Sequence, residues 1–114
     1  MAAPTSPTLQ ATTAAAASLA MPDDMRFLIT DADAPDAYPI AGFSWVLAYR
    51  NQAKVSTGQA LASYLWWQIH AGQKYAAKLN YAPLSENTVK KAEALILSMR
   101  CGPDPCLIQT EPTP

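Results

Sequence analysis

The sequence predicts one helix-rich α/β domain in which two strands are covered by three to four helices. Three observations indicate this class: an alanine-rich stretch near the N-terminus, two short apolar runs typical of strands, and a C-terminal segment with apolar residues at helical spacing. Half of the 114 residues are apolar and 15% are charged. A chain of this size and composition can bury one core and is too apolar for intrinsic disorder.

The ends of the chain are predicted to be poorly ordered, because seven of the ten prolines lie before residue 23 or after residue 102. We expect residues 1–7 to be disordered, residues 8–100 to form the folded part, and residues 101–114 to form a proline-rich tail. In this tail, Cys101 and Cys106 flank the turn-forming sequence Gly-Pro-Asp-Pro. A disulfide is preferred if the protein is exported, with two free thiols as the alternative. The pair does not resemble a zinc site.

The first expected element is an alanine-rich helix from Pro7 to Ala20. Alanine has the highest helix propensity, but Leu9 and Leu19 are the only large apolar residues, so the helix is predicted to be poorly anchored. A signal peptide is a weaker interpretation, because no basic residue precedes this stretch and its alanines and threonines are only weakly apolar. We therefore expect no signal peptide in this chain, and no apolar run is long enough to predict a membrane span.

Two strands are expected next. Arg26–Thr30 is a short apolar run bounded by aspartates, and Phe43–Arg50 is rich in aromatic and β-branched residues without glycine or proline. The intervening Asp31–Pro39 contains three aspartates and two prolines and is predicted to be a loop. A calcium loop beginning at Asp31 would need glycine at its sixth position and glutamate at its twelfth, and this sequence has neither. Turn-forming aspartates are preferred, and no metal site is predicted.

A helical region is expected between residues 56 and 79. Ser56 or Thr57 is the candidate N-cap. The helix should run to about Ala71 and continue past a kink near Gly72 until Asn80, a suitable helix stop. Its apolar arc exceeds about 200°, whereas an ordinary surface helix needs an apolar stripe only somewhat wider than about 100°. We infer that this helix is covered on two sides, in part by polypeptide outside this chain.

The last helix carries the clearest local signals. Ser85 is the expected N-cap. Glu86 in the first turn complements the helix dipole and can pair with Lys90 one turn later. Leu84 and Val89 form a candidate hydrophobic staple across the cap. These features predict a helix that begins at residue 86 and presents one apolar face up to about residue 99.

Few residues are candidates for chemistry. His70 is the only histidine and lies on the polar line of its helix, so an exposed side chain is preferred to a catalytic one. Ser56, Thr57 and Gly58 at a helix start could bind an anion through free N–H groups and hydroxyls, with simple capping as the preferred alternative. No nucleophile, base and orienting group form a set, so an enzyme is not expected, and no cofactor is predicted.

Neither charge nor aromatic content predicts a ligand surface. The net charge is −4 before residue 50 and +5 from residue 50 to residue 100. The basic residues of the second part are scattered rather than dense, which argues against nucleic-acid binding. The three tryptophans and five tyrosines could form a platform for a sugar or an aromatic ligand. They fall at core-like spacing within the expected elements, however, so packing is the preferred interpretation.

Five blocks of the sequence form a recognisable series. They are AYPIAGFSWVLAYR at residues 37–50, YLWW at 64–67, GQKYA at 72–76, YAPL at 81–84 and VKKAEAL at 89–95. In this order and spacing they resemble the C-terminal third of the phosphate-binding proteins that serve bacterial phosphate ABC transporters. The similarity extends from about Pro7 to Met99, and five ordered blocks are far more specific than any single motif.

The resemblance implies a partial lobe of a type II periplasmic-binding-protein-like fold, in the periplasm or cell envelope. Such proteins hold inorganic phosphate between two lobes and deliver it to an ABC permease in the inner membrane. The family's phosphate ligands match no position here, which implies that phosphate binds only with the missing N-terminal lobe or a partner chain. Tyr38, Pro39 and Gly42 fall where the family's chain returns to the first lobe. This implies a hinge-adjacent role, with the ordinary start of a strand as the alternative.

The leading hypothesis is therefore the C-terminal part of a phosphate-binding protein, present as a truncated or split fragment. It would contribute scaffold and hinge but no phosphate ligands. The alternative is a free-standing, self-associating interaction module without a solute site. Dimerisation that depends on concentration, without phosphate binding, would favour this alternative.

Overall fold

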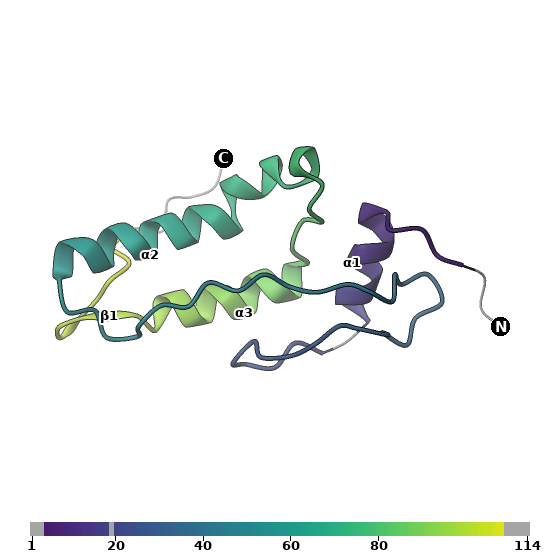
Figure 1. Ribbon diagram of the computed structural model, residues 1–114. Helices are drawn as coiled ribbons and strands as arrows, with labels where there is room; N and C mark the ends of the chain where they lie inside the picture. The colour runs from purple at the N-terminus through teal and green to yellow at the C-terminus, as the bar shows by residue number, and fades with distance from the viewer. Residues whose placement is uncertain (1–3, 19, 109–114) are drawn as a thin grey trace.

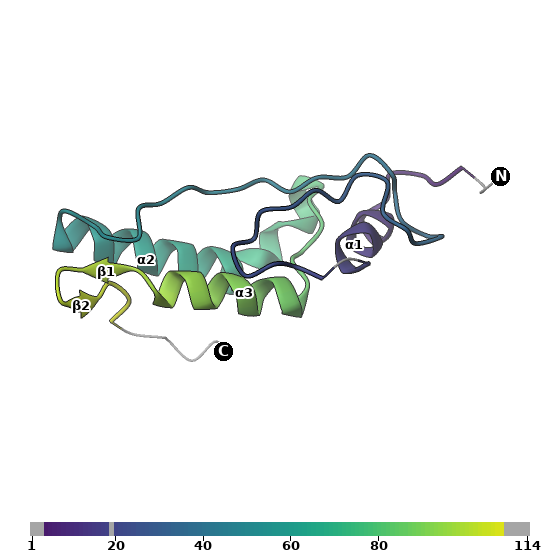
Figure 2. The same ribbon diagram turned by 90° about the horizontal axis from the view of Figure 1, so that it is seen from below.

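The computed structural model describes residues 4–18 and 20–108. The regular elements are the helices α1 (Leu9–Ala17), α2 (Val55–Ile69) and α3 (Glu86–Leu97), the 3₁₀ helices η1 (Ala71–Tyr75) and η2 (Ala77–Leu79), and the short strands β1 (Arg100–Cys101) and β2 (Asp104–Pro105). α2 and α3 lie side by side and antiparallel, and α1 lies at the end of the molecule where α3 begins (Figure 1 and Figure 2). The helix-rich α/β class is thus confirmed.

The prediction of strands at Arg26–Thr30 and Phe43–Arg50 is wrong. Neither segment belongs to a sheet, because no neighbouring strand in the described part of the chain offers it a hydrogen-bonding ladder. The observed sheet is instead the antiparallel hairpin of β1 and β2, with Arg100 opposite Pro105. Asn51 adds a single parallel bridge to Arg100. The β structure therefore sits beyond the C-terminal end of α3, in a region that the sequence, apart from Arg100, assigned to the tail.

Local capping sets the starts of α1 and α3. The Thr8 hydroxyl accepts a hydrogen bond from the Ala11 N–H at 3.1 Å, and the Ser85 hydroxyl accepts one from the Thr88 N–H at 3.3 Å. Each satisfies a backbone donor that a first helical turn leaves free. The predicted N-cap of α3 is confirmed, and so is the alanine-rich helix, of which α1 forms the central nine residues.

α2 differs from its predicted bounds. It begins after Lys54, which makes no side-chain capping bond, so the N-cap predicted at Ser56 or Thr57 is wrong. The backbone of residues 50 and 52 is hydrogen-bonded to Arg100, and this tertiary tether, rather than a hydroxyl, determines where the helix begins. At its other end the chain tightens into η1 and η2 until Asn80, whose left-handed backbone (φ 61°) confirms the predicted stop.

Two separate clusters form the core. The hairpin core lies between α2, α3 and the β-hairpin and consists of Ala62, Ile96, Met99, Cys101, Cys106 and Leu107. The alanine cluster packs α1 against the loops that follow it and is centred on Ala15, Ile29 and Ala37. Residues 101–107, expected in a tail, thus supply three side chains of the hairpin core. The remaining tail, residues 109–114, and residues 1–3 of the expected disordered N-terminus lie outside the described residues.

The molecule is elongated and exposes more surface than a compact chain of its length. Its radius of gyration is 16.1 Å and its extents are 55 × 27 × 18 Å, whereas a compact domain of this length has a radius of gyration of about 13 Å. The accessible surface is 8219 Å², about one third more than the roughly 6,100 Å² of a compact monomer of this mass. Exposed apolar side chains such as Leu28 and Leu47 contribute to this excess.

Candidate functional site

The predicted anion-binding residues Ser56, Thr57 and Gly58 lie in the first turn of α2. Ser56 and Thr57 are exposed, whereas Gly58 is buried and its N–H donates to the carbonyl of Lys54 at 2.9 Å. The turn offers two hydroxyls and the N–H groups of its first residues to solvent. None of the three predicted residues adds a positive charge. The anion role therefore stays a prediction that rests on a helix N-terminus alone.

Gly58 has a packing role that the sequence does not reveal. A Cβ atom at this position would lie 2.4 Å from the Sγ of Cys101 and 2.7 Å from the Cβ of Gln52. Both distances are far below van der Waals contact, so glycine permits the close approach of α2 to the β-hairpin. Cys101 and Cys106 form a disulfide there, and neither residue is more than 3% exposed. The disulfide is thus part of the core and lies against α2.

The hinge-adjacent residues Tyr38, Pro39 and Gly42 connect the alanine cluster to an exposed stretch. The Tyr38 N–H donates to the carbonyl of Ala11 at 3.0 Å, and the carbonyl of Pro39 accepts from the Asp31 N–H at 2.8 Å. Gly42 is exposed, and no atom lies within 4 Å of the position that a Cβ would take. The backbone changes here from tethered to open, which is a property that a hinge needs, and the hinge role remains a prediction.

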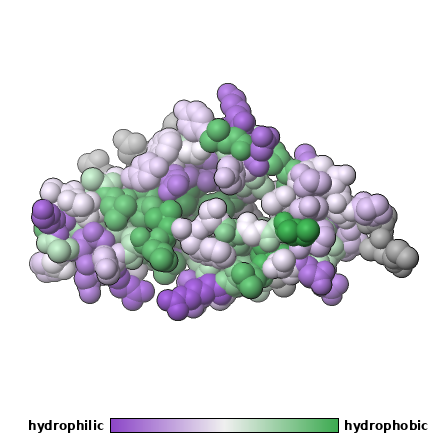
Figure 3. Space-filling view, viewed as in Figure 1, coloured by the Kyte–Doolittle hydropathy of each residue, from purple (hydrophilic) through white to green (hydrophobic). Residues whose placement is uncertain are grey.

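Residues 40–49, which we call the extended segment, run along the molecule from the α1 end toward the start of α2 (Figure 1 and Figure 2). Leu47 is 95% exposed, Tyr49 is 85% exposed, and Ile40 and Val46 are also exposed. Figure 3 shows apolar side chains gathered on the face viewed in Figure 1. Within the described residues, the backbone of this segment makes no hydrogen bond to another backbone group. An apolar stretch with free backbone groups is incomplete as a structural unit.

A second bare surface, the aromatic face, lies on α2 and η1. The ring centroids of Tyr64 and Trp67 are 6.0 Å apart, and those of Trp67 and Tyr75 are 6.2 Å apart. The Nζ of Lys74 lies 5.1 Å from the centroid of the Tyr75 ring, a cation–π distance. All three rings are exposed. The prediction that the aromatic residues pack in a core is wrong for these rings and for Trp45, Tyr49 and Tyr81, which are also exposed.

A polar junction that sequence reasoning missed connects α2 to α3. The His70 Nε2 lies 2.7 Å from the Glu93 Oε1, and the His70 Nδ1 lies 2.8 Å from the carbonyl oxygen of Trp66. The imidazole is 16% exposed, so the prediction of a solvent-exposed histidine is wrong. A ring protonated on both nitrogens donates to both oxygens, and a neutral ring donates to only one. Glu93 is 23 residues away in sequence, so only helix packing brings it to His70.

An ion pair between Asp23 and Lys91 joins the loop after α1 to α3. The hydrogen bond from the Lys91 ammonium, followed by its charge, lowers the pKa of the Asp23 carboxyl, because both favour the ionised form. The Asp23 side chain is exposed, so solvent screens the pair and its contribution to stability is small. It nevertheless connects the region around α1 to the helix pair α2 and α3.

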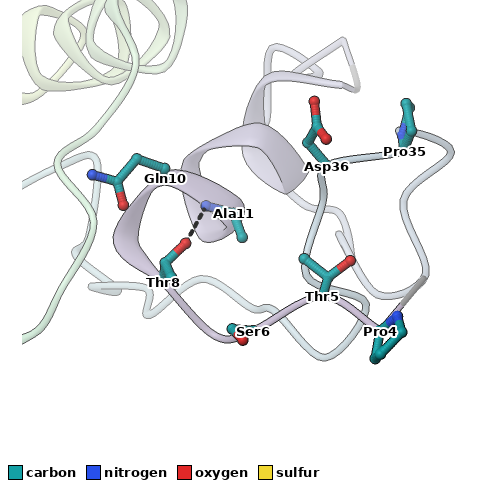
Figure 4. Close-up of a pocket in the computed structure, with 8 residues that line it drawn as sticks. All are labelled: Pro4, Thr5, Ser6, Thr8, Gln10, Ala11, Pro35 and Asp36. Atoms are coloured by element: carbon teal, nitrogen blue, oxygen red, sulfur yellow. Dashed lines mark hydrogen bonds between the residues drawn. The ribbon is translucent and has the colours of Figure 1, made fainter.

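An open hollow lies beside the start of α1 (Figure 4). Its lining residues are Pro4, Thr5, Ser6, Thr8, Gln10, Ala11, Pro35 and Asp36. The Thr8 hydroxyl in this hollow is already bonded to the Ala11 N–H, as the dashed line in Figure 4 marks. No lining residue is basic, and the Asp36 carboxylate repels anions. This hollow therefore lacks the charged donors that a phosphate site uses.

Among residues 4–18 and 20–108, no three His, Cys, Asp or Glu side chains gather as metal ligands would. In the same part of the chain, no helix combines the length and the apolar character needed to cross a membrane.

Comparison with known proteins shows that the chain is similar to phosphate-binding proteins. It is 32% identical over 71 residues to the phosphate-binding protein PstS of Xylella fastidiosa strain 9a5c, and equally to that of strain Temecula1. It is 24% identical over 70 residues to the phosphate-binding protein PstS of Pasteurella multocida. The chain resembles PstS. No protein-family profile matches it.

The alignment with PstS covers 62% of this chain but only 20% of the Xylella proteins. The chain thus spans about a fifth of the length of these relatives. The resemblance to phosphate-binding proteins indicated by the five sequence blocks is confirmed. The PstS relatives are named for binding rather than for catalysis. Most of the length of PstS has no counterpart in the alignment. In this chain, the extended segment and the aromatic face both expose apolar side chains to solvent.

Proposed function

We propose that the protein is part of a phosphate-binding protein of a bacterial ABC-type phosphate import system and contributes scaffold and hinge rather than phosphate ligands. The observation that carries this proposal is the 71-residue similarity to PstS at 32% identity. The bare extended segment and aromatic face support a scaffold role, because apolar surface of this kind is normally buried against other polypeptide. Inorganic phosphate then binds only when the remainder of the binding protein is present, in the same chain or a second one.

The absence of phosphate ligands from this region is supported by the chemistry of its candidate sites. A small anion taken out of water needs several donors that converge on it and a positive counter-charge. The first turn of α2 offers the exposed and uncharged Ser56 and Thr57, and the hollow beside α1 carries the Asp36 carboxylate. We retain Ser56, Thr57 and Gly58 only as a secondary anion site, and Tyr38, Pro39 and Gly42 as the hinge-adjacent segment.

We place the protein in the periplasm or cell envelope, where an ABC permease of the inner membrane is its partner. The buried disulfide between Cys101 and Cys106 supports this location, because disulfides persist in oxidising compartments and are rare in the cytosol. The disulfide belongs to the hairpin core, where it lies against α2. Extraction in the presence of a thiol-alkylating reagent, followed by mass spectrometry, should show both cysteines unmodified.

The proposal is tested by titrating inorganic phosphate calorimetrically at low salt and neutral pH. The purified chain alone should show no binding. A chimera in which this chain replaces the aligned part of Xylella fastidiosa PstS should bind phosphate with an affinity within about tenfold of intact PstS, a free-energy difference of about 1.4 kcal/mol. Stoichiometric tight binding by the chain alone would contradict the scaffold role. A folded chimera that binds no phosphate would contradict the relationship to phosphate import.

A second candidate function is a self-associating interaction module without a solute site. The exposed extended segment favours it, because an unpaired apolar strand can pair with the same strand of a second copy. Sedimentation of the chain over a hundredfold range of concentration separates the two candidates. A stable dimer, together with a chimera that binds no phosphate, would favour the module. A monomer would favour the phosphate-binding role.

A further inference from the structure

His70 lies at the boundary between α2 and η1, where the backbone leaves the α-helical conformation. Its N–H donates to the carbonyl of Trp67 at 3.2 Å rather than to that of Trp66, which a continuing α-helix would use. The imidazole Nδ1 lies 2.8 Å from the Trp66 carbonyl oxygen that is thus left over. Because a carbonyl oxygen only accepts hydrogen bonds, Nδ1 carries a hydrogen in this arrangement.

The second ring nitrogen of His70 faces a carboxyl group. Nε2 lies 2.7 Å from Oε1 of Glu93. With Nδ1 protonated, a neutral ring offers only a lone pair at Nε2, and an ionised carboxyl group also offers only lone pairs. The contact is therefore a hydrogen bond only when one further proton lies between the two atoms. The junction as a whole holds one proton more than a neutral imidazole and an ionised carboxyl group hold.

The surroundings of this junction favour the protonated ring. The side chains of His70 and Glu93 are 16% and 31% exposed, so solvent screens their contact less than it screens a surface pair. The centroid of the Trp66 ring lies 4.5 Å from that of the imidazole, within the range of a cation–π contact. A charged imidazole thus gains an opposite charge on one side and an aromatic ring on another.

The other titratable side chains of α2, η1 and α3 have partners of their own. α2 carries no charged residue. The remaining side chains contact groups other than His70: Tyr64 contacts Trp67, Lys74 contacts Tyr75, Lys90 contacts Glu86, and Lys91 contacts Asp23. Within the described residues, Glu93 is therefore the charged group that is paired with the imidazole.

We propose that His70 and Glu93 form a pH-sensitive latch, which holds the end of α2 to α3 while the imidazole is protonated and opens when the extra proton is lost. Histidine is the side chain whose charge ordinarily changes between about pH 5 and 8. The Trp66 carbonyl is fixed in the helix, whereas the partly exposed Glu93 side chain can turn toward water. The Glu93 contact is therefore the one that opens as the pH rises.

The sign of the pH dependence follows from the extra proton. The folded chain binds this proton through a contact that the unfolded chain lacks, so the stabilisation is complete at acidic pH. It is lost as the pH rises through the titration of the folded chain. The latch lies within this chain and does not depend on the proposed phosphate role.

A second clamp on the same connection does not titrate. The side-chain amide of Gln73 donates to the Gln68 carbonyl at 2.9 Å and accepts from the Leu84 N–H at 2.8 Å. It thereby ties η1 to α2 and to the residue that precedes the Ser85 cap of α3. An amide has no proton to lose at these pH values. Gln73 therefore provides a comparison in which the same connection is held independently of pH.

NMR of the only histidine in the chain tests the latch directly. The ring ¹⁵N shifts of the full chain should show hydrogen on both nitrogens at acidic pH. After the titration they should show hydrogen on Nδ1 alone, because the Trp66 carbonyl keeps its donor. Hydrogen on Nε2 alone at alkaline pH would show that the Glu93 contact survives, and it would overturn the latch.

Urea unfolding at about pH 5.5 and about pH 8 measures the energetic effect. The unfolding equilibrium constant of the parent chain should rise about fivefold between the two, the effect of one hydrogen bond. Glu93→Gln is the matched control, because an amide can accept from a protonated ring and donate to a neutral one. Its constant should change less than about twofold. Gln73→Ala should raise the constant by the same factor at both pH values.

Each result supports the latch or overturns it. An equal pH dependence in the parent chain and in Glu93→Gln would assign the titration to another group and overturn the latch. A parent chain whose stability stays constant while the His70 ring titrates would overturn it as well. The NMR titration needs no variant, so it decides the question even when Glu93→Gln does not fold.

Discussion

Replacement of Gly58 by alanine is predicted to destabilise the protein, although the same change stabilises an ordinary helix by about 0.5–1 kcal/mol. In α2 the added Cβ would lie 2.4 Å from the Sγ of Cys101 and 2.7 Å from the Cβ of Gln52. Neither neighbour can move away freely. The sulfur belongs to a buried disulfide, and the Gln52 N–H is bonded to the carbonyl of Arg100 at 2.8 Å.

The magnitude follows from two opposed effects. Overpacking of a core costs about 1–3 kcal/mol, and contacts about 1 Å inside the optimal separation place this variant at the upper end. Subtracting the gain in helix propensity leaves a loss of about 2 kcal/mol in the free energy of unfolding. For a chain of this length the corresponding decrease in Tm is roughly 8–12 °C.

Urea unfolding followed by circular dichroism and tryptophan fluorescence measures this loss. Gly42→Ala is the matched control, because no atom lies within 4 Å of the new Cβ, and it should change stability by less than about 0.5 kcal/mol. In a background that lacks both cysteines, Gly58→Ala should cost less because the closest atom is gone. A Gly58→Ala variant at least as stable as the parent would refute the close approach of α2 to the β-hairpin.

Three further predictions concern the contacts between elements. Replacing both disulfide cysteines by alanine should lower the free energy of unfolding by about 2 kcal/mol, the entropy of closing a loop of this length, and an unchanged urea midpoint would contradict this. A double-mutant cycle with His70→Ala and Glu93→Ala should give a coupling free energy of about 1 kcal/mol. The same cycle on the exposed ion pair of Glu86 and Lys90 in α3 should give less than about 0.5 kcal/mol. Equal couplings would show that the junction is not formed in solution. The lowered pKa of Asp23 stabilises the folded state above the unfolded value near 3.8, and this contribution is lost as the pH falls through the folded pKa. Lys91→Met should raise the NMR titration midpoint of that carboxyl toward 3.8, and an unmoved midpoint would exclude the ion pair.

The features that sequence predicts correctly are those set within one helical turn. Ser85 caps α3, Glu86 and Lys90 pair at 3.0 Å, and Asn80 ends the 3₁₀ region in the left-handed conformation. Each depends on residues no more than four positions apart, so the sequence alone contains both partners. The alanine-rich α1 belongs to the same class, because propensity and the Thr8 cap suffice to place it.

The predicted strands fail for a physical reason that concerns neighbours rather than propensity. Residues 43–50 have the composition and the extended backbone of a strand, but a strand exists only when another backbone lies alongside it. In the described part of the chain, no backbone group is hydrogen-bonded to the backbone of residues 43–49, although the ring of Phe27 packs against that of Phe43. The aromatic face on α2 is likewise exposed, and the inference from the apolar arc that other polypeptide covers this helix stays a prediction.

The sequence by itself determined the alanine-rich helix, the Ser85 cap of α3, the stop at Asn80 and the resemblance to phosphate-binding proteins, because these depend on short-range chemistry and on ordered blocks that can be read in one dimension. Only the tertiary structure decided that Gly58 lies against the disulfide, that residues 101–107 complete the hairpin core, and that His70 meets Glu93. These contacts join residues 23 or more positions apart, or depend on the space between packed elements. Their energies act only after α2, α3 and the β-hairpin have come together, so no local pattern in the sequence records them.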